Sequence, residues 1–216
     1  MRRRAYGDTG VELSMIGFGG ILVSGTEASE AGSLVSEAVD RGVNYFDVAP
    51  TYGNAQEMLG PALEPYRNDV FLSCKTTERT ASGARTELEE SLRLLRTDHV
   101  DLYQLHSLNT DEDFDTATGP GGAWEVFLQA REEGKARFLG FSSHSAETAL
   151  HLIESVDGLD SVLFPTNWCT WLAAGFGPQV IDAAQQKGLA RLALKAMAYG
   201  KIAEGAEKKW SRCWYQ

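Results

Sequence analysis

Apolar runs of strand length alternate with stretches of helical period along most of the chain. Between the runs, apolar residues recur at spacings of three and four, which gives each expected helix one apolar stripe. This alternation predicts a parallel sheet whose strands are joined by helical crossovers. Seven such strands are expected, at Met15–Gly19, Val43–Asp47, Val70–Lys75, Val100–His106, Arg137–Ser142, Ser161–Pro165 and Leu189–Lys195.

Two further segments complete the expected architecture. Arg3–Tyr6 and Val11–Leu13 flank a turn with two glycines, which predicts an N-terminal β-hairpin. The longest polar stretch, Asn109–Gly122, is expected to be a loop at the mouth of the fold. Since no linker, repeat or low-complexity tract interrupts the pattern, residues 1–216 are expected to form a single domain.

The choice between an open doubly wound sheet and a closed barrel depends on two features. The glycines of Gly17-Phe18-Gly19-Gly20 do not extend to G-x-G-x-x-G, because position 22 is Leu, so the dinucleotide fingerprint of the open fold is missing. Polar residues also stand at the ends of several different strands, as they do around the mouth of a barrel. A TIM barrel is therefore expected, ending after its seventh strand.

Composition narrows the class of protein. The 216 residues carry a net charge of −10, which argues against a nucleic-acid partner. Arg2, Arg3 and Arg4 precede no apolar signal segment, and no run of about 18 apolar residues predicts a membrane span. The three cysteines lie far apart without C-x-x-C spacing, which favours a reducing cytoplasm. We expect an acidic, soluble, cytoplasmic protein.

Four polar residues form the candidate chemistry, and we call them the tetrad: Asp47, Tyr52, Lys75 and His106. Such a group can reduce a carbonyl if the Tyr52 phenol donates a proton while a bound nicotinamide delivers hydride. The Lys75 ammonium is expected to lower the phenol's pKa, and Asp47 to keep Lys75 charged. His106 is expected to orient the carbonyl oxygen.

Asp47 and Tyr52 also have a structural interpretation when each is taken alone, whereas a lysine at a barrel strand end, such as Lys75, points toward the mouth. Asp47 at a strand end can cap a turn, and Tyr52 can be a surface aromatic. His99 and His151 are expected to be solvated or packed, while the role of His144 stays open. No metal site is expected from these residues.

The spacing of three motifs resembles the aldo-keto reductase family. Residues 6–20, YGDTGVELSMIGFGG, look like the family's opening hairpin and first strand. Residues 42–47, GVNYFD, with 49–53, APTYG, are similar to its second-strand signature. Residues 101–106, DLYQLH, are similar to its fourth-strand signature. The matches occur in the family's order over nearly the whole chain.

The resemblance implies a (β/α)8 barrel, NADPH as cofactor with NADH as the alternative, and reduction of aldehydes or ketones to alcohols. It assigns Tyr52 as the acid, Lys75 and Asp47 as its tuning pair, and His106 as the substrate orienter. Two departures stand out: Ser143 replaces an Asn of many relatives, and Leu194 or Lys195 replaces an aromatic. Cofactor contacts are expected from Gly19, Gly20, Ser142, Ser143 and Asn167.

The sequence ends at Gln216, after seven of the barrel's eight strands. Three explanations are open: a fragment of a longer protein, a gap closed by a partner chain through the open edge, or a degenerate copy. Three functions compete accordingly. They are an NADPH-dependent carbonyl reductase, a cofactor-sensing regulatory subunit like the potassium-channel β subunit of this family, and an inactive scaffold.

Overall fold

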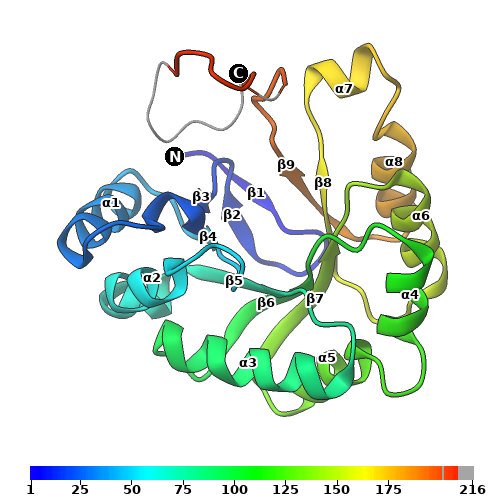
Figure 1. Cartoon of the computed structure of the whole chain (residues 1–216), viewed down its shortest axis with the longest axis horizontal. Coiled ribbons are helices and arrows are strands. Elements are labelled where there is room, and N and C mark those ends of the chain that lie inside the picture. Colours follow the sequence, from blue (N-terminus) through cyan, green and yellow to red (C-terminus); the bar gives the residue numbers. More distant parts are fainter. Residues whose placement is uncertain (201, 209–216) are drawn as a thin grey trace.

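The computed structural model describes residues 1–200 and 202–208. Its centre is a seven-stranded parallel sheet in which the strands follow one another in chain order. The helices form an arc around the outside of this curved sheet (Figure 1). The strands are β3 (Phe18–Gly19), β4 (Tyr45–Asp47), β5 (Phe71–Thr76), β6 (Val100–Leu105), β7 (Ala136–Ser142), β8 (Ser161–Pro165) and β9 (Ala190–Leu194).

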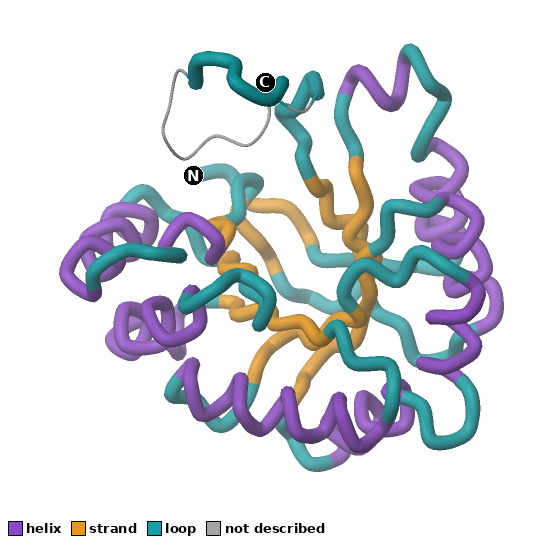
Figure 2. The backbone as a smooth tube through the Cα atoms, in the orientation of Figure 1, coloured by secondary structure: helices purple, strands orange, loops and turns teal. Residues whose placement is uncertain are grey.

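The helices occupy the connections between successive strands, as the purple segments of Figure 2 show. Two short 3-10 helices, η1 (Gly20–Val23) and η2 (Glu64–Asp69), follow β3 and precede β5. The α-helices are α1 (Ala28–Asp40), α2 (Ala55–Leu63), α3 (Ala81–Leu95), α4 (Asp111–Thr118), α5 (Ala123–Glu132), α6 (Ala146–Ser155), α7 (Trp168–Leu172) and α8 (Pro178–Gln186).

The seven predicted strands and the predicted hairpin are confirmed, and the order from β3 to β9 is that of a TIM barrel without an eighth strand among the described residues. Two strands, β3 and β4, begin two or three residues later than predicted. The Met15 backbone N–H bonds Arg2, which keeps Met15 with the hairpin, and the Val43 N–H bonds Ala38 at the end of α1. The backbone N–H groups of Met15 and Val43 are therefore bonded outside the sheet, and each strand begins after them.

One expectation about a loop is wrong. The stretch Asn109–Gly122 contains helix α4, although its composition is that of a loop. The Thr110 side chain accepts a hydrogen bond from the Asp113 N–H, three acidic residues occupy the first turn, and Phe114 is buried. Acidic residues stabilise the positive end of a helix, so this polar sequence favours a short helix.

Because side chains alternate between the two faces of each strand, the sheet separates two apolar cores. In β5, Leu72 and Cys74 belong to the large core between sheet and helices, whereas Phe71 belongs to a smaller core inside the sheet's curve. The hairpin of β1 (Arg3–Ala5) and β2 (Glu12–Ser14) contributes Tyr6 from its turn and Leu13 from β2 to that inner core. The Tyr6 ring lies 5.1 Å from Phe71 and 5.3 Å from Phe138, so the hairpin covers the amino end of the sheet.

Candidate active site

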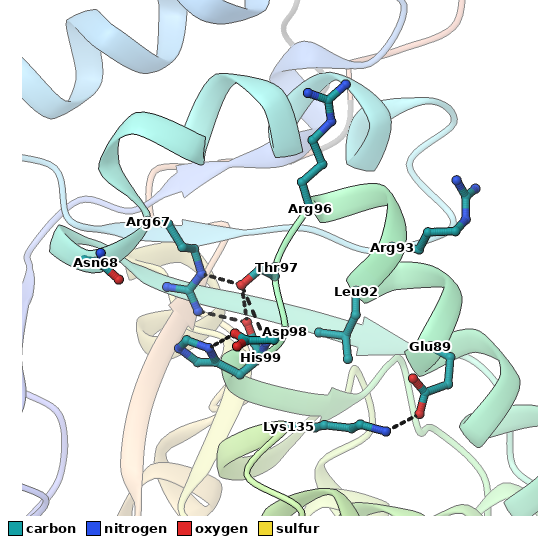
Figure 3. A pocket seen from close by; sticks show the side chains of 10 residues that line it. All are labelled: Arg67, Asn68, Glu89, Leu92, Arg93, Arg96, Thr97, Asp98, His99 and Lys135. Carbon is teal, nitrogen blue, oxygen red and sulfur yellow. Dashed lines mark hydrogen bonds and ion pairs between the residues drawn. The ribbon is translucent and has the colours of Figure 1, made fainter.

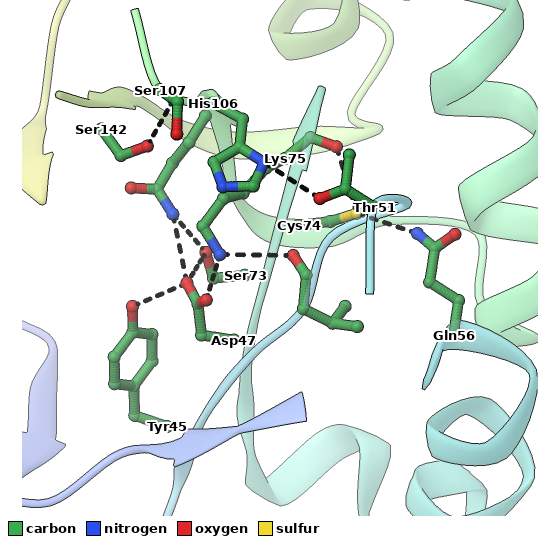
Figure 4. A network of polar contacts seen from close by, with 12 residues as sticks. Tyr45, Asp47, Thr51, Gln56, Ser73, Cys74, Lys75, His106, Ser107 and Ser142 are labelled. Atoms are coloured by element: carbon green, nitrogen blue, oxygen red, sulfur yellow. Dashed lines mark hydrogen bonds and ion pairs between the residues drawn. The ribbon is translucent and has the colours of Figure 1, made fainter. Parts of the chain in front are cut away.

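Three neighbouring strands bring three tetrad residues to the carboxyl edge of the sheet. Asp47 ends β4, Lys75 is the last residue but one of β5, and His106 follows β6 directly. Since side chains alternate along a strand, Lys75 points to the side opposite Leu72 and Cys74, into the sheet's curve. The three side chains therefore meet at one edge (Figure 4).

Tyr52 reaches this edge from the turn between β4 and α2. The turn is closed by hydrogen bonds from the Tyr52 N–H to Ala49 and from the Ala55 N–H to Tyr52. Gly53 adopts a φ of +60°, which favours glycine. The phenol ring lies with its centroid 5.3 Å from the Lys75 ammonium and 5.8 Å from the His106 ring. All four tetrad residues are thus brought together.

Lys75 is a buried cation with one anionic partner. Its side chain is 1% exposed, it forms an ion pair with Asp47, and its ammonium lies 3.5 Å from the Val48 carbonyl oxygen. Burial alone would lower the pKa of Lys75, but the Asp47 carboxylate raises the pKa above its ordinary value. The ammonium is therefore a fixed positive charge beside Tyr52.

Three neutral side chains hold the other oxygen of Asp47, and the sequence reasoning did not identify them. The Tyr45 hydroxyl and the Ser73 hydroxyl each donate to Asp47 Oδ2 at 3.1 Å, and the Gln104 amide donates to it at 3.3 Å. Gln104 also donates to Ser73 Oγ at 2.7 Å. We call Tyr45, Ser73 and Gln104 the donor cage. The sequence could have indicated two of these residues. Ser73 stands two residues before Lys75, and Gln104 two residues before His106, so each lies on the same strand face as a tetrad residue.

The expected lowering of the Tyr52 pKa is not the net result. Burial raises the pKa of the phenol above its ordinary value, and the Lys75 charge, which lowers it, offsets only part of that effect. Tyr52 is therefore a protonated phenol at neutral pH. The Lys75 ammonium stabilises the phenolate that forms when the proton leaves.

His106 is a neutral imidazole at the same edge. Burial, together with the Lys75 charge, lowers its pKa to about 4. Its Nδ1 atom lies 3.5 Å from the Thr51 hydroxyl, and its backbone carbonyl accepts a hydrogen bond from Arg79 at 2.8 Å. A neutral imidazole donates a hydrogen bond from one ring nitrogen and accepts one at the other.

We expect the proton titration of His106 to have its midpoint near pH 4, because burial disfavours the imidazolium. Since the unfolded chain takes up this proton near pH 6.5, the free energy of unfolding should fall as pH drops from about 6.5 towards 4. Imidazole proton NMR, assigned with His106→Gln, measures the midpoint, and that variant should lose this part of the pH dependence. A midpoint at pH 6 or above would contradict the assignment.

The two glycines expected to contact a cofactor differ in their surroundings. A Cβ at Gly19 would meet only Ile21 within 4 Å, at 3.9 Å, so the backbone there is open to a ligand. A Cβ at Gly20 would lie 2.9 Å from Val48 and 3.0 Å from the Asp47 carbonyl oxygen. Gly20 is therefore explained by packing against the end of β4, which leaves Gly19 as the better candidate for a cofactor contact.

The three polar candidates are all engaged within the chain. Ser142 Oγ accepts the Ser107 N–H at 2.8 Å, and the fully buried Ser143 hydroxyl bonds the Ser145 backbone. Asn167 caps α7, its amide oxygen accepting the Thr170 N–H at 2.9 Å. These side chains shape the loops after β7 and β8, and direct contact with a cofactor stays a prediction.

A separate hollow lies at the opposite, amino edge of the sheet (Figure 3). Its basic side chains are paired: Arg67 with Asp101, Arg93 with Glu90, and Lys135 with Glu89. Arg67 also donates to the Thr97 hydroxyl and the His99 carbonyl. These contacts hold together the segments that enter β5 and β6, so we assign the residues of the hollow a role in the stability of the fold.

Residues 1–200 and 202–208 contain neither a metal-binding cluster nor a membrane-spanning helix. Within that part of the chain, no group of three or more His, Cys, Asp or Glu residues is arranged to hold a metal ion. No helix there is both long and apolar enough to cross a membrane.

The fold and the site define a barrel-type α/β protein with a Tyr, Lys, Asp and His group at the carboxyl edge of its sheet. The chain belongs to the aldo/keto reductase family, whose model matches residues 15–211. The resemblance seen in the three sequence motifs is thereby confirmed.

Individual relatives support the same assignment. The chain is 32% identical over 157 residues to the uncharacterized oxidoreductase YqkF of Bacillus subtilis, covering 66% of this chain and 49% of YqkF. It is 32% identical over 166 residues to the aldo-keto reductase YhdN of the same organism, covering 68% of this chain and 48% of YhdN. The crystal structure of PA4992 from Pseudomonas aeruginosa superposes with a TM-score of 0.79 at 27% identity, covering 92% of this chain and 79% of PA4992.

The matches are partial on the relatives' side. The chain spans about half the length of YqkF and YhdN. The activities of those whole proteins are therefore only proposals for this chain.

Proposed function

We propose that this chain carries the reaction centre of an NADPH-dependent carbonyl reductase, in which Tyr52 protonates the oxygen of an aldehyde or ketone. The observation that supports this most directly is the Tyr52 phenol beside an ammonium that is 1% exposed and paired with Asp47. A phenol backed by a fixed positive charge is a proton donor for a developing alkoxide.

The proton transfer follows from this geometry. As electron density builds on the carbonyl oxygen, Tyr52 gives up its hydroxyl proton to that oxygen, and the phenolate left behind faces Lys75. Because Lys75 is already charged and held by Asp47, little reorganisation accompanies the step. His106, neutral at physiological pH, donates a hydrogen bond that keeps the oxygen beside Tyr52.

The residues at this edge fit a nicotinamide cofactor, which supplies the hydride when it is bound. The tetrad provides a proton donor and an orienting group, and the open backbone at Gly19 permits close approach. Gly19 and Gly20 would hold the cofactor through backbone contacts, and Ser142, Ser143 and Asn167 would shape or contact the carboxamide end. NADPH is proposed as the cofactor, with NADH as the alternative.

The wider setting is also a proposal. Cys74 is buried and Cys169 is partly buried, both as free thiols, which agrees with a reducing, cytoplasmic environment. A small-molecule carbonyl compound is the proposed substrate. Self-association through the outer edges of β3 and β9 is proposed as a second property, because these edges have no partner strand among the described residues and such an edge favours pairing with another chain.

Titrating the 216-residue chain with NADPH, and separately with NADH, tests the proposal. Saturable quenching of the five tryptophans is expected, followed by oxidation of NADPH when an aldehyde is added. Quenching with slow turnover, limited by release of the nucleotide, would instead support the cofactor-sensing function. A folded chain that quenches with neither nucleotide would contradict both.

A further inference from the structure

We infer that the donor cage of Tyr45, Ser73 and Gln104 is a positioning device that fixes the Asp47 carboxylate so that Lys75 stays beneath Tyr52. This inference rests on the proposed function and adds three residues to it. None of the three is expected to touch substrate or cofactor. They act on the reaction through Asp47.

The contacts are directional. One Asp47 oxygen faces Lys75, and the other accepts from all three members of the donor cage, at 3.1, 3.1 and 3.3 Å. The carboxylate plane is thereby fixed at both oxygens. A carboxylate held only by Lys75 is free to rotate and to draw the ammonium away from the ring 5.3 Å distant.

Gln104 is the most informative member. It is fully buried, and its amide nitrogen supports Asp47 directly and also through Ser73, which donates onward to the carboxylate. Hydrogen bonds in such a chain polarise and strengthen one another.

The orientation of the Gln104 amide follows from its neighbours. A flipped amide would place its oxygen against the Asp47 carboxylate at the same 3.3 Å, which is repulsive. The amide oxygen has no partner among the described residues and is buried. A buried oxygen without a hydrogen-bond partner destabilises the folded chain. The hydrogen bonds that the Gln104 amide nitrogen donates to Asp47 and Ser73 explain why a glutamine stands at this buried position.

The test compares Gln104→Met with wild type. Methionine keeps the length of the side chain and removes the donor. Turnover of an aldehyde should fall about 10- to 100-fold, because a small misplacement of a reacting group has effects of that size. NADPH affinity, measured by tryptophan quenching, should not change. Wild-type turnover in this variant would overturn the inference and leave the proposed function standing.

Gln56→Met is the matched control. Gln56 is 4% exposed and donates to Ser91 Oγ at 2.8 Å and Cys74 Sγ at 3.3 Å, on the helix side of the sheet. This variant also loses two hydrogen bonds of a buried glutamine, so its melting temperature should fall similarly while turnover is retained. Equal loss of turnover in both variants would mean that general destabilisation, and not positioning, explains the effect.

The pH dependence of turnover in Gln104→Glu distinguishes a positioning role of the side chain at residue 104 from a packing role. A protonated carboxyl at this position can donate to Asp47, whereas an ionised one repels it. Relative to wild type, turnover should approach normal near pH 5 and decline towards pH 8, with the buried carboxyl's pKa raised by burial and by Asp47. A turnover ratio that does not change with pH would contradict positioning. The ionisable groups facing this position are Asp47 and Tyr45 from β4, Lys75 from β5 and His106 from β6.

Two further measurements keep the test decisive. If Gln104→Met does not fold, Tyr45→Phe replaces it, because it removes one hydroxyl and keeps the ring packed 5.9 Å from Phe71. If wild type shows no turnover, the proposed function fails, and the cofactor-free protein still tests the inference. A buried, ion-paired ammonium gives a slowly exchanging proton–nitrogen NMR signal, assigned with Lys75→Met. That signal should be lost in Gln104→Met, and its persistence would overturn the inference.

Discussion

Replacing Tyr52 with Phe should lower aldehyde turnover about 10²- to 10⁴-fold, which is the range for loss of a general acid or base. The substitution removes the hydroxyl that is proposed to donate the proton and keeps the ring that packs between Lys75 and His106. NADPH affinity should stay nearly unchanged, since the hydroxyl provides little binding surface. Stopped-flow absorbance of NADPH with the variant, beside tryptophan quenching, measures both quantities.

The control for this prediction is Tyr66→Phe. Tyr66 is partly buried in η2, away from the tetrad, and its hydroxyl donates to Ser36 at 3.3 Å. Turnover should survive this loss of a tyrosine hydroxyl. Reduction of aldehydes at the wild-type rate by Tyr52→Phe would exclude Tyr52 as the proton donor.

The two members of the ion pair should differ in their effect on stability. Asp47→Ala leaves the Lys75 ammonium buried without an anionic partner, beside the Val48 carbonyl oxygen and the Tyr52 phenol, and it also deprives the donor cage of its acceptor. Breaking a buried pair in this way costs about 3–5 kcal/mol. Lys75→Met leaves Asp47 with three neutral donors at one oxygen, and a cost of about 1–3 kcal/mol is expected.

Urea denaturation of both variants measures this difference as a change in midpoint at constant slope. Both variants should lose turnover, because each removes the fixed charge beside Tyr52 or its anchor. If Lys75→Met proved the less stable variant, the donor cage would not satisfy Asp47 in the way that the contacts indicate.

The strands were predictable because their signal is local. Short apolar runs bounded by glycine and polar residues identify β5 through β9 to within one or two residues. The tetrad was predictable for a related reason, since strand ends meet at one edge of a parallel sheet. By contrast, α4 was missed, because only Phe114 and Ala117 of its eight residues are buried.

The finer electrostatics could not be predicted from sequence. Whether burial or Lys75 dominates the pKa of Tyr52 depends on how deeply the phenol sits, which is a property of packing. The same holds for Ser143, whose complete burial is set by the loops around it. The donor cage could have been predicted from the sequence, because a polar residue at an inward-facing strand position needs a hydrogen-bond partner.

The strand order has a consequence for the way the chain assembles during synthesis. Every pairing in the seven-stranded sheet joins strands that are consecutive in the sequence, so each pairing closes a loop of modest length. All four tetrad residues lie between positions 47 and 106, on β4 and β5, in one turn and directly after β6. The residues of the tetrad are therefore all synthesised before β7, β8 and the loops that follow them.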